Sequence, residues 1–148
     1  MAVSRDTMTR RSGKPSEREL WNKINAARKL IEDQEWDAPN PGKLDDDLRG
    51  LEETFGTEWA TDEDKLFLFS EALSEITAGD YCETRNQPEE SRELETAGLE
   101  MWKFKWQSQK DCFGKCVMWM KFSVIGTGDK GPLWIYSLHI DHPPPEQE

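Results

Sequence analysis

The sequence predicts an α+β protein in which N-terminal helices pack on one face of a C-terminal antiparallel β-meander. In the first 79 residues, apolar side chains recur every three or four positions, which is the period of an amphipathic helix. After Gly98 they alternate with polar residues, which is the period of a strand, and glycines separate the alternating runs. The 148 residues suit one domain, since domains commonly hold about 100–200 residues.

Three amphipathic helices are expected between residues 16 and 79. Ser16 and Glu19 match the S-x-x-E capping box that marks the start of a helix. A loop containing Pro41 precedes the second helix, and the third is expected to begin near Thr61 and to end at Gly79. The residues expected to face inward are Leu20, Ile24, Ala27 and Ile31, then Leu44, Leu48, Leu51 and Phe55, then Leu66, Phe69, Leu73 and Ile76.

Three strands joined by two hairpins are expected after the helices. A polar, acidic loop over 83–100, with a helical turn near Ser91–Ala97, separates them from the helices, and an additional short strand is expected near Asp80–Thr84. Together the strands form an antiparallel meander. The three main strands are expected at Met101–Trp106, Cys116–Val124 and Leu133–Ile140.

Alternation along each strand assigns every side chain to one of two faces. The apolar rows, which we expect to face the helices, contain Trp102, Phe104, Trp106, Cys116, Met118, Met120, Phe122, Val124, Trp134, Tyr136, Leu138 and Ile140. The opposite face collects Lys103, Lys105, Trp119, Lys121, Ser137 and His139.

The six side chains of the opposite face include lysines, a tryptophan and a histidine, which are residue types that can bind a nucleic acid and transfer a proton. Lysines neutralise phosphates, a tryptophan such as Trp119 can stack on a base, and a histidine such as His139 can move a proton near neutral pH. Cleavage of RNA by its own 2′-hydroxyl needs a base, an acid and a cation, and no metal. The alternative is that these are the ordinary solvent-facing residues of a half-buried sheet, and alternation by itself favours that alternative.

The charge is unevenly distributed along the chain. There are 19 basic and 30 acidic residues, a net charge of −11, which excludes a uniformly basic nucleic-acid coat protein. Residues 31–100 hold five basic and twenty-two acidic residues, whereas residues 101–148 hold six and five. Because salt screens charges beyond about 8–10 Å, a locally basic surface can still bind a phosphate chain. The acidic middle favours a second hypothesis, a non-catalytic protein that mimics nucleic acid or binds a basic partner.

We expect a single domain over residues 16–141, with a helical part at 16–79 and a sheet part at 80–141. Residues 1–15 are expected to form a disordered basic arm, and residues 142–148 a disordered tail. No window approaches the roughly 18 apolar residues of a membrane span, and no secretory leader opens the chain. A cytoplasmic protein with reduced cysteines is therefore expected.

Cysteines and histidines offer an alternative metal site. Cys112 and Cys116 could in principle combine with His139 and His142 in a tetrahedral zinc site. Alternation disfavours this, because it places Cys116 and His139 on opposite faces of the sheet. No metal or other cofactor is expected.

Four segments, in this order, resemble the motility quorum-sensing regulator (MqsR) toxins of the RelE/ParE-like superfamily. They are Leu73–Tyr81 with its L-x-x-[LI]-[TS]-x-x-D-[FY] pattern, the W-x-F strand at Trp102, the run Met118–Phe122, and the terminal run Ile135–Asp141. The resemblance covers roughly residues 66–141. It implies a RelE-like fold and the toxin of a type II toxin–antitoxin pair. Such toxins are metal-independent endoribonucleases that cleave mRNA and are bound by an antitoxin protein.

The resemblance also implies roles for single residues. Lys121 matches the family's strand lysine and His139 its terminal basic residue, so these two are the expected catalytic residues. Trp119 stands where the family usually has a tyrosine. The family often has a lysine just after the Asp-Tyr turn, and here Arg85 is the nearest cation. The residues expected to bind RNA are Lys103, Lys105, Trp119 and Arg85.

Overall fold

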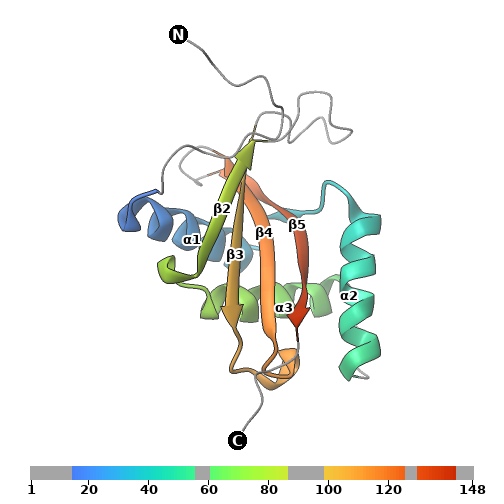
Figure 1. Ribbon diagram of the computed structural model, residues 1–148. Coiled ribbons are helices and arrows are strands. Elements are labelled where there is room, and N and C mark those ends of the chain that lie inside the picture. The colour runs from blue at the N-terminus through green and yellow to red at the C-terminus, as the bar shows by residue number, and fades with distance from the viewer. Residues whose placement is uncertain (1–14, 56–60, 87–98, 126–129, 143–148) are drawn as a thin grey trace, which may run out of the picture.

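The computed structural model describes residues 15–55, 61–86, 99–125 and 130–142. Apart from the two-residue strand β1, the helices precede the strands of the sheet, which confirms the predicted α+β class (Figure 1). In chain order the elements are α1 (Glu17–Glu32), β1 (Trp36–Asp37), α2 (Pro41–Phe55), α3 (Asp62–Glu75), the 3₁₀ turn η1 (Ala78–Asp80), β2 (Tyr81–Asn86), β3 (Glu100–Gln107), the 3₁₀ turn η3 (Asp111–Phe113), β4 (Val117–Ile125) and β5 (Lys130–His142).

The five strands form one sheet in the order β1-β5-β4-β3-β2. Strands β2 to β5 are antiparallel neighbours, which confirms the predicted meander. Strand β1 was not predicted. It pairs in parallel with β5 through Trp36 and Leu133, which makes the sheet mixed. Two residues are too short to show an alternating pattern in the sequence.

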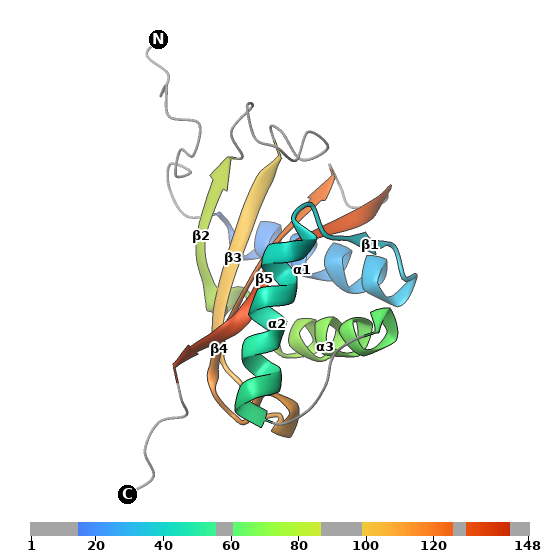
Figure 2. The same ribbon diagram turned by 90° about the vertical axis from the view of Figure 1, so that its right-hand side faces the viewer.

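The helices occupy two places around the sheet. Helices α1 and α3 lie behind it in Figure 1, whereas α2 runs beside β5 at the edge, as Figure 2 shows from the side. The sheet face opposite α1 and α3 is therefore turned to the viewer in Figure 1.

Local side-chain contacts fix the helix ends. Ser16 Oγ accepts a hydrogen bond from the Glu19 amide at 3.1 Å, and Thr61 and Asp64 form a reciprocal capping box, so both predicted starts are confirmed. Helix α2 begins at Pro41 rather than after it, because proline suits the first turn, where no amide partner is needed. Helix α3 ends at Glu75, four residues before the predicted Gly79.

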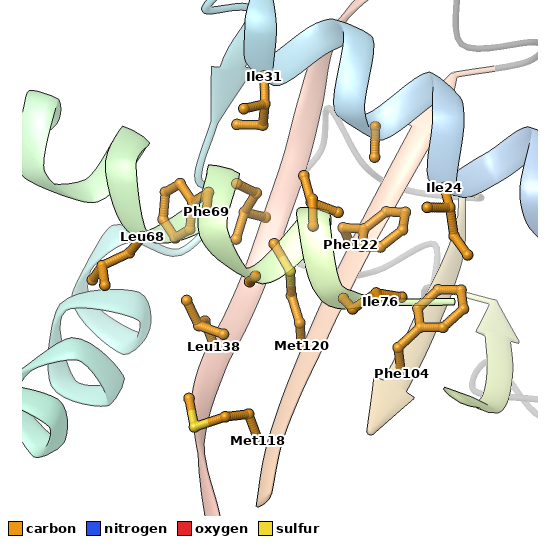
Figure 3. Close-up of a cluster of buried hydrophobic side chains, with 14 of the residues drawn as sticks. Ile24, Ile31, Leu68, Phe69, Ile76, Phe104, Met118, Met120, Phe122 and Leu138 are labelled. Atoms are coloured by element: carbon orange, nitrogen blue, oxygen red, sulfur yellow. The ribbon is translucent and has the colours of Figure 1, made fainter. Parts of the chain in front are cut away.

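The core lies between the sheet and the helices (Figure 3). Ile24 of α1 and Phe69 of α3 belong to the same cluster as Phe104, Met120 and Phe122 of the central strands, and all five are fully buried. Helix α2 contributes Leu44, Leu48 and Leu51 to the same core. The predicted inward rows of β3 and β4 are confirmed. Leu66, predicted to be inward, is only half-buried and Leu68 takes a fully buried place beside it.

A bulge in β5 overturns part of the predicted row on that strand. Lys121 of β4 pairs with Ser137, but its neighbour Phe122 pairs with Ile135, so Tyr136 is an extra residue. Because of the bulge, the residues of β5 up to Tyr136 face the opposite side of the sheet from the side that alternation predicts. Ile135 therefore joins the helix-side core together with Leu133, whereas Trp134 and Tyr136 pack with Met101 in a separate cluster. Only Leu138 and Ile140 keep the predicted orientation.

Several boundary predictions are settled by the described residues. The short strand predicted near 80–84 is present as β2 and extends to Asn86, so the predicted loop does not include residues 83–86. Pro15, which was predicted to belong to the disordered arm, is buried. His142, which was predicted to be the first residue of the disordered tail, is the last residue of β5. The rest of the arm, the rest of the tail and the helical turn near 91–97 lie outside the described residues. None of the helices in the described part has the length and hydropathy that a membrane crossing requires.

Candidate functional site

Six side chains predicted to share a face are brought together on the side of the sheet opposite α1 and α3. Lys105, Trp119 and His139 stand directly opposite one another on β3, β4 and β5. Lys103, Lys121 and Ser137 form the adjacent row in the same way. Directly opposed residues in antiparallel pairs have Cβ atoms about 4.5–5.5 Å apart. We call this set of six residues the Trp119 face.

The Trp119 indole is the centre of this face. The ammonium groups of Lys103 and Lys121 lie 4.4 and 4.8 Å from the centre of its ring, both within the range of a cation–π contact. The imidazole of His139 meets the indole edge-to-face, with ring centres 3.6 Å apart and planes inclined at 75°. The ring therefore holds two cations and a histidine beside one another. A base could stack on it only if one of these side chains moved.

The face carries acidic side chains as well as lysines. Lys105 Nζ forms an ion pair with Asp141 at 3.1 Å. Glu83 of β2 stands opposite Lys103, so it lies on the same face. The face is therefore less positive than its lysines alone suggest, and its two most central cations are Lys103 and Lys121.

His139 is half-buried, and its ring has a defined tautomer. Nδ1 lies 3.0 Å from the Ile140 carbonyl oxygen, and since a carbonyl only accepts, Nδ1 carries the proton and Nε2 the lone pair. Burial lowers the pKa of His139 below its usual value near 6.5. The Ile140 carbonyl and Asp47 act in the opposite direction and raise it, while Lys43 and Lys121 lower it further. The imidazole is therefore neutral at pH 7 and can accept a proton at Nε2.

Asp47 belongs to the site, although it was not among the predicted site residues. Its Oδ2 accepts a hydrogen bond from Ser137 Oγ at 2.6 Å and lies 3.6 Å from Lys43 Nζ. Only 14% of its side chain is exposed. It could have been found from its spacing, because it lies three residues after Leu44 and four before Leu51, on the border of the buried stripe of α2.

An open depression lies beside His139, on the side away from Trp119. It has a volume of about 390 Å³ and is lined by Asp46, Asp47, Gly50, His139 and Ile140. A Cβ atom at Gly50 would meet no other atom within 4 Å, so the depression is open at that point of α2. His139 thus stands between the lysines of the sheet on one side and α2 on the other.

Arg85 is the one predicted site residue whose side chain lies outside the described part of the structure. Its backbone belongs to β2 and pairs with Met101, next to the Trp119 face along β3. The prediction that Arg85 binds RNA stays a prediction.

The alternative zinc site is not formed by the described residues. Cys116 is buried in the core on the helix side of the sheet, and Cys112 is half-buried in the turn before β4. Burial raises the pKa of both thiols, which keeps them protonated. Across the described ranges, no group of three or more metal-ligating side chains is close enough to bind a metal ion.

Comparison with known proteins finds no matching family model, no matching curated protein and no matching solved structure. The resemblance to the MqsR toxins therefore depends on the sequence segments alone.

Proposed function

We propose that this protein is a metal-independent endoribonuclease that cleaves mRNA, acts as the toxin of a type II toxin–antitoxin pair, and uses the Trp119 face as its active site. The observation that best supports this is that His139 and Lys121 stand on adjacent strands of the Trp119 face. The two are diagonal neighbours on adjacent strands, about 7–8 Å apart at the backbone, which is within reach of one phosphodiester. One group can accept a proton while the other carries a positive charge beside it.

The reaction balances with these two residues. His139 Nε2 takes the proton of a ribose 2′-hydroxyl, and the 2′-oxygen forms a bond to the adjacent phosphorus. The bond from phosphorus to the 5′-oxygen breaks, and the Lys121 ammonium donates a proton to that oxygen. The products are a 2′,3′-cyclic phosphate and a 5′-hydroxyl, and water returns both residues to their starting protonation states.

The neighbouring residues support these steps. Lys103, held against the same indole as Lys121, adds a second positive charge where the phosphorane develops. Asp47 stabilises the imidazolium that forms when His139 accepts a proton, because its charge favours that form. Trp119 fixes the positions of both lysines and of the imidazole.

Expression in a bacterium tests the function as a whole. The wild-type chain should arrest growth and deplete mRNA, and His139→Ala or Lys121→Ala should relieve the arrest. Lys29→Ala is a matched control, because Lys29 is an exposed lysine on α1 that pairs only with Asp33 among the described residues. Coexpression of a small DNA-binding protein encoded beside the gene should also relieve the arrest. Harmless expression of the wild-type chain would contradict the proposal.

The second candidate function is a non-catalytic protein that binds a basic partner. A separate cavity of about 390 Å³ between β1 and the starts of α2 and α3 favours it. Its lining includes Lys65, but Lys65 pairs with Asp45 at 2.9 Å, and three further acidic residues line the cavity: Asp37, Asp62 and Glu63. Tight binding to a cationic protein, with no RNA cleavage, would support this candidate instead of the first.

A further inference from the structure

The order of groups around His139 matches the order of groups in a nucleotide. Lys103 and Lys121 lie on one side of it, over Trp119, and the depression beside α2 lies on the other. In RNA the ribose stands between its phosphate and its base. A ribose whose 2′-hydroxyl meets His139, with its phosphate at the lysines, therefore directs its base toward α2.

The geometry points to the depression beside α2 as a nucleobase subsite that prefers bases with an exocyclic amino group over uracil. This inference rests on the proposed ribonuclease function, and it names the part of the substrate that the site reads.

The residues that line the depression account for the preference for bases with an exocyclic amino group. Asp46 and Asp47 present only acceptor oxygens, which suit the amino groups of adenine, cytosine and guanine. Uracil presents two carbonyl oxygens beside its single N–H, and these are repelled by carboxylates. Each of two hydrogen bonds within the protein uses one of these carboxylate oxygens. Asp46 Oδ1 accepts a hydrogen bond from Arg49 at 2.7 Å, and Asp47 Oδ2 accepts one from Ser137.

Gly50 leaves room for the base. It lies in the interior of α2, where glycine costs about 1 kcal/mol of helix stability relative to alanine. A side chain there would extend into the depression without meeting another atom at its Cβ position. Gly50→Leu should therefore fill the subsite and leave the helix at least as stable as before.

The test uses 2′-O-methyl oligonucleotides that carry a single 2′-hydroxyl, placed at A, C, G or U, so that each has one cleavable bond. The wild-type full chain should cleave the A, C and G substrates about tenfold faster than the U substrate, as expected for one hydrogen bond to a charged group. Asp46→Ala should reduce this difference. Gly50→Leu should lower all rates at least tenfold without lowering the melting temperature, whereas Gly42→Ala, near the start of the same helix and outside the depression, should leave them unchanged.

The outcomes separate the inference from the function on which it rests. Cleavage of all four substrates at equal rates, unaffected by Gly50→Leu, would overturn the subsite and leave the ribonuclease standing. Full cleavage by Gly50→Leu together with loss of binding to an oligoarginine peptide would assign the depression to a basic protein partner and overturn the inference. No cleavage of any substrate by the wild-type chain would overturn both.

Discussion

Ser137 of β5 donates a 2.6 Å hydrogen bond to Asp47 of α2, across ninety positions of the chain. Ser137 is fully buried, and Asp47 is nearly so. The bond fixes the middle of α2 against the strand that carries His139, and so it sets the width of the depression between them. Helix α2, which contributes leucines to the core, is therefore also held against the Trp119 face by this hydrogen bond.

Removal of the Asp47 carboxylate should destabilise the fold. Asp47→Ala leaves the buried hydroxyl of Ser137 without its acceptor, and an unsatisfied buried polar group costs about 1–3 kcal/mol of unfolding free energy. Urea denaturation measures this cost. The double variant Asp47→Ala/Ser137→Ala is the control, because it removes both partners and should recover part of the loss. Equal stability of Asp47→Ala and the wild type would show that the bond contributes nothing.

Arg28 should stabilise the end of α3. Its guanidinium donates to the carbonyls of Leu73 and Ile76 at 2.8 and 2.9 Å, which satisfies acceptors that a helix end leaves open. We expect Arg28→Met to cost about 1–3 kcal/mol of unfolding free energy. Arg49→Met, which removes an exposed ion pair with Asp46, should cost less than about 1 kcal/mol. Similar losses in the two variants would argue against a capping role for Arg28.

The rate of RNA cleavage should fall on acidification as His139 becomes protonated and can no longer act as a base. Because burial lowers its pKa, the midpoint of the fall in kcat/KM should lie below pH 6.5. Asp47→Asn should move that midpoint to still lower pH, since the Asp47 charge raises the pKa. A midpoint above 6.5, or a rate that rises on acidification, would exclude His139 as the base.

The free energy of unfolding should also depend on the protonation of His139. The pKa of His139 is lower in the folded chain than in the unfolded chain, so the unfolded chain binds the proton more readily. The stabilising contribution of the neutral ring is complete above about pH 6.5 and is lost as the pH falls toward the folded-state pKa. The difference in unfolding free energy between the wild type and His139→Gln should therefore shrink between pH 7 and pH 5. A difference that grows over that range would contradict the assignment.

The salt dependence of RNA binding should distinguish the lysines. Each phosphate neutralised on a single strand contributes about −0.7 to the slope of log affinity against log salt. Lys121→Ala should reduce the magnitude of the slope by about that amount. Lys105→Ala should reduce it less, because Lys105 already pairs with Asp141. Filter binding of a 2′-deoxy oligonucleotide, which cannot be cleaved, gives the slopes, and a larger effect of Lys105→Ala would reverse this ranking.

Much of the fold could be predicted because its elements follow simple periods. The helices obey the 3.6-residue period, and their starts carry recognisable caps at Ser16 and Thr61. Strands β3 and β4 alternate without interruption along their paired length, so the faces of Lys103, Trp119 and Lys121 could be assigned from the sequence.

The rest depends on contacts between distant segments. The bulge at Tyr136 is set by how β5 pairs with β4, and nothing in the local sequence marks it. Strand β1 is defined by its pairing with β5, in which Trp36 pairs with Leu133 and Asp37 with Trp134. Asp47 was not among the predicted site residues, because its partner Ser137 lies ninety positions away in the sequence. Since α2 begins six residues earlier, at Pro41, Asp47 lies in the middle of α2 and faces Ser137.

The most direct test of the proposed chemistry is to incubate purified protein with a defined RNA in the presence of EDTA and to analyse the new ends. The wild-type chain should produce 2′,3′-cyclic phosphate and 5′-hydroxyl ends. His139→Ala, with an unchanged circular dichroism spectrum, should lose at least about a hundredfold in rate, the usual contribution of a general base. Undiminished cleavage by His139→Ala, or cleavage only after a divalent metal is added, would contradict the assignment of the Trp119 face as a ribonuclease site.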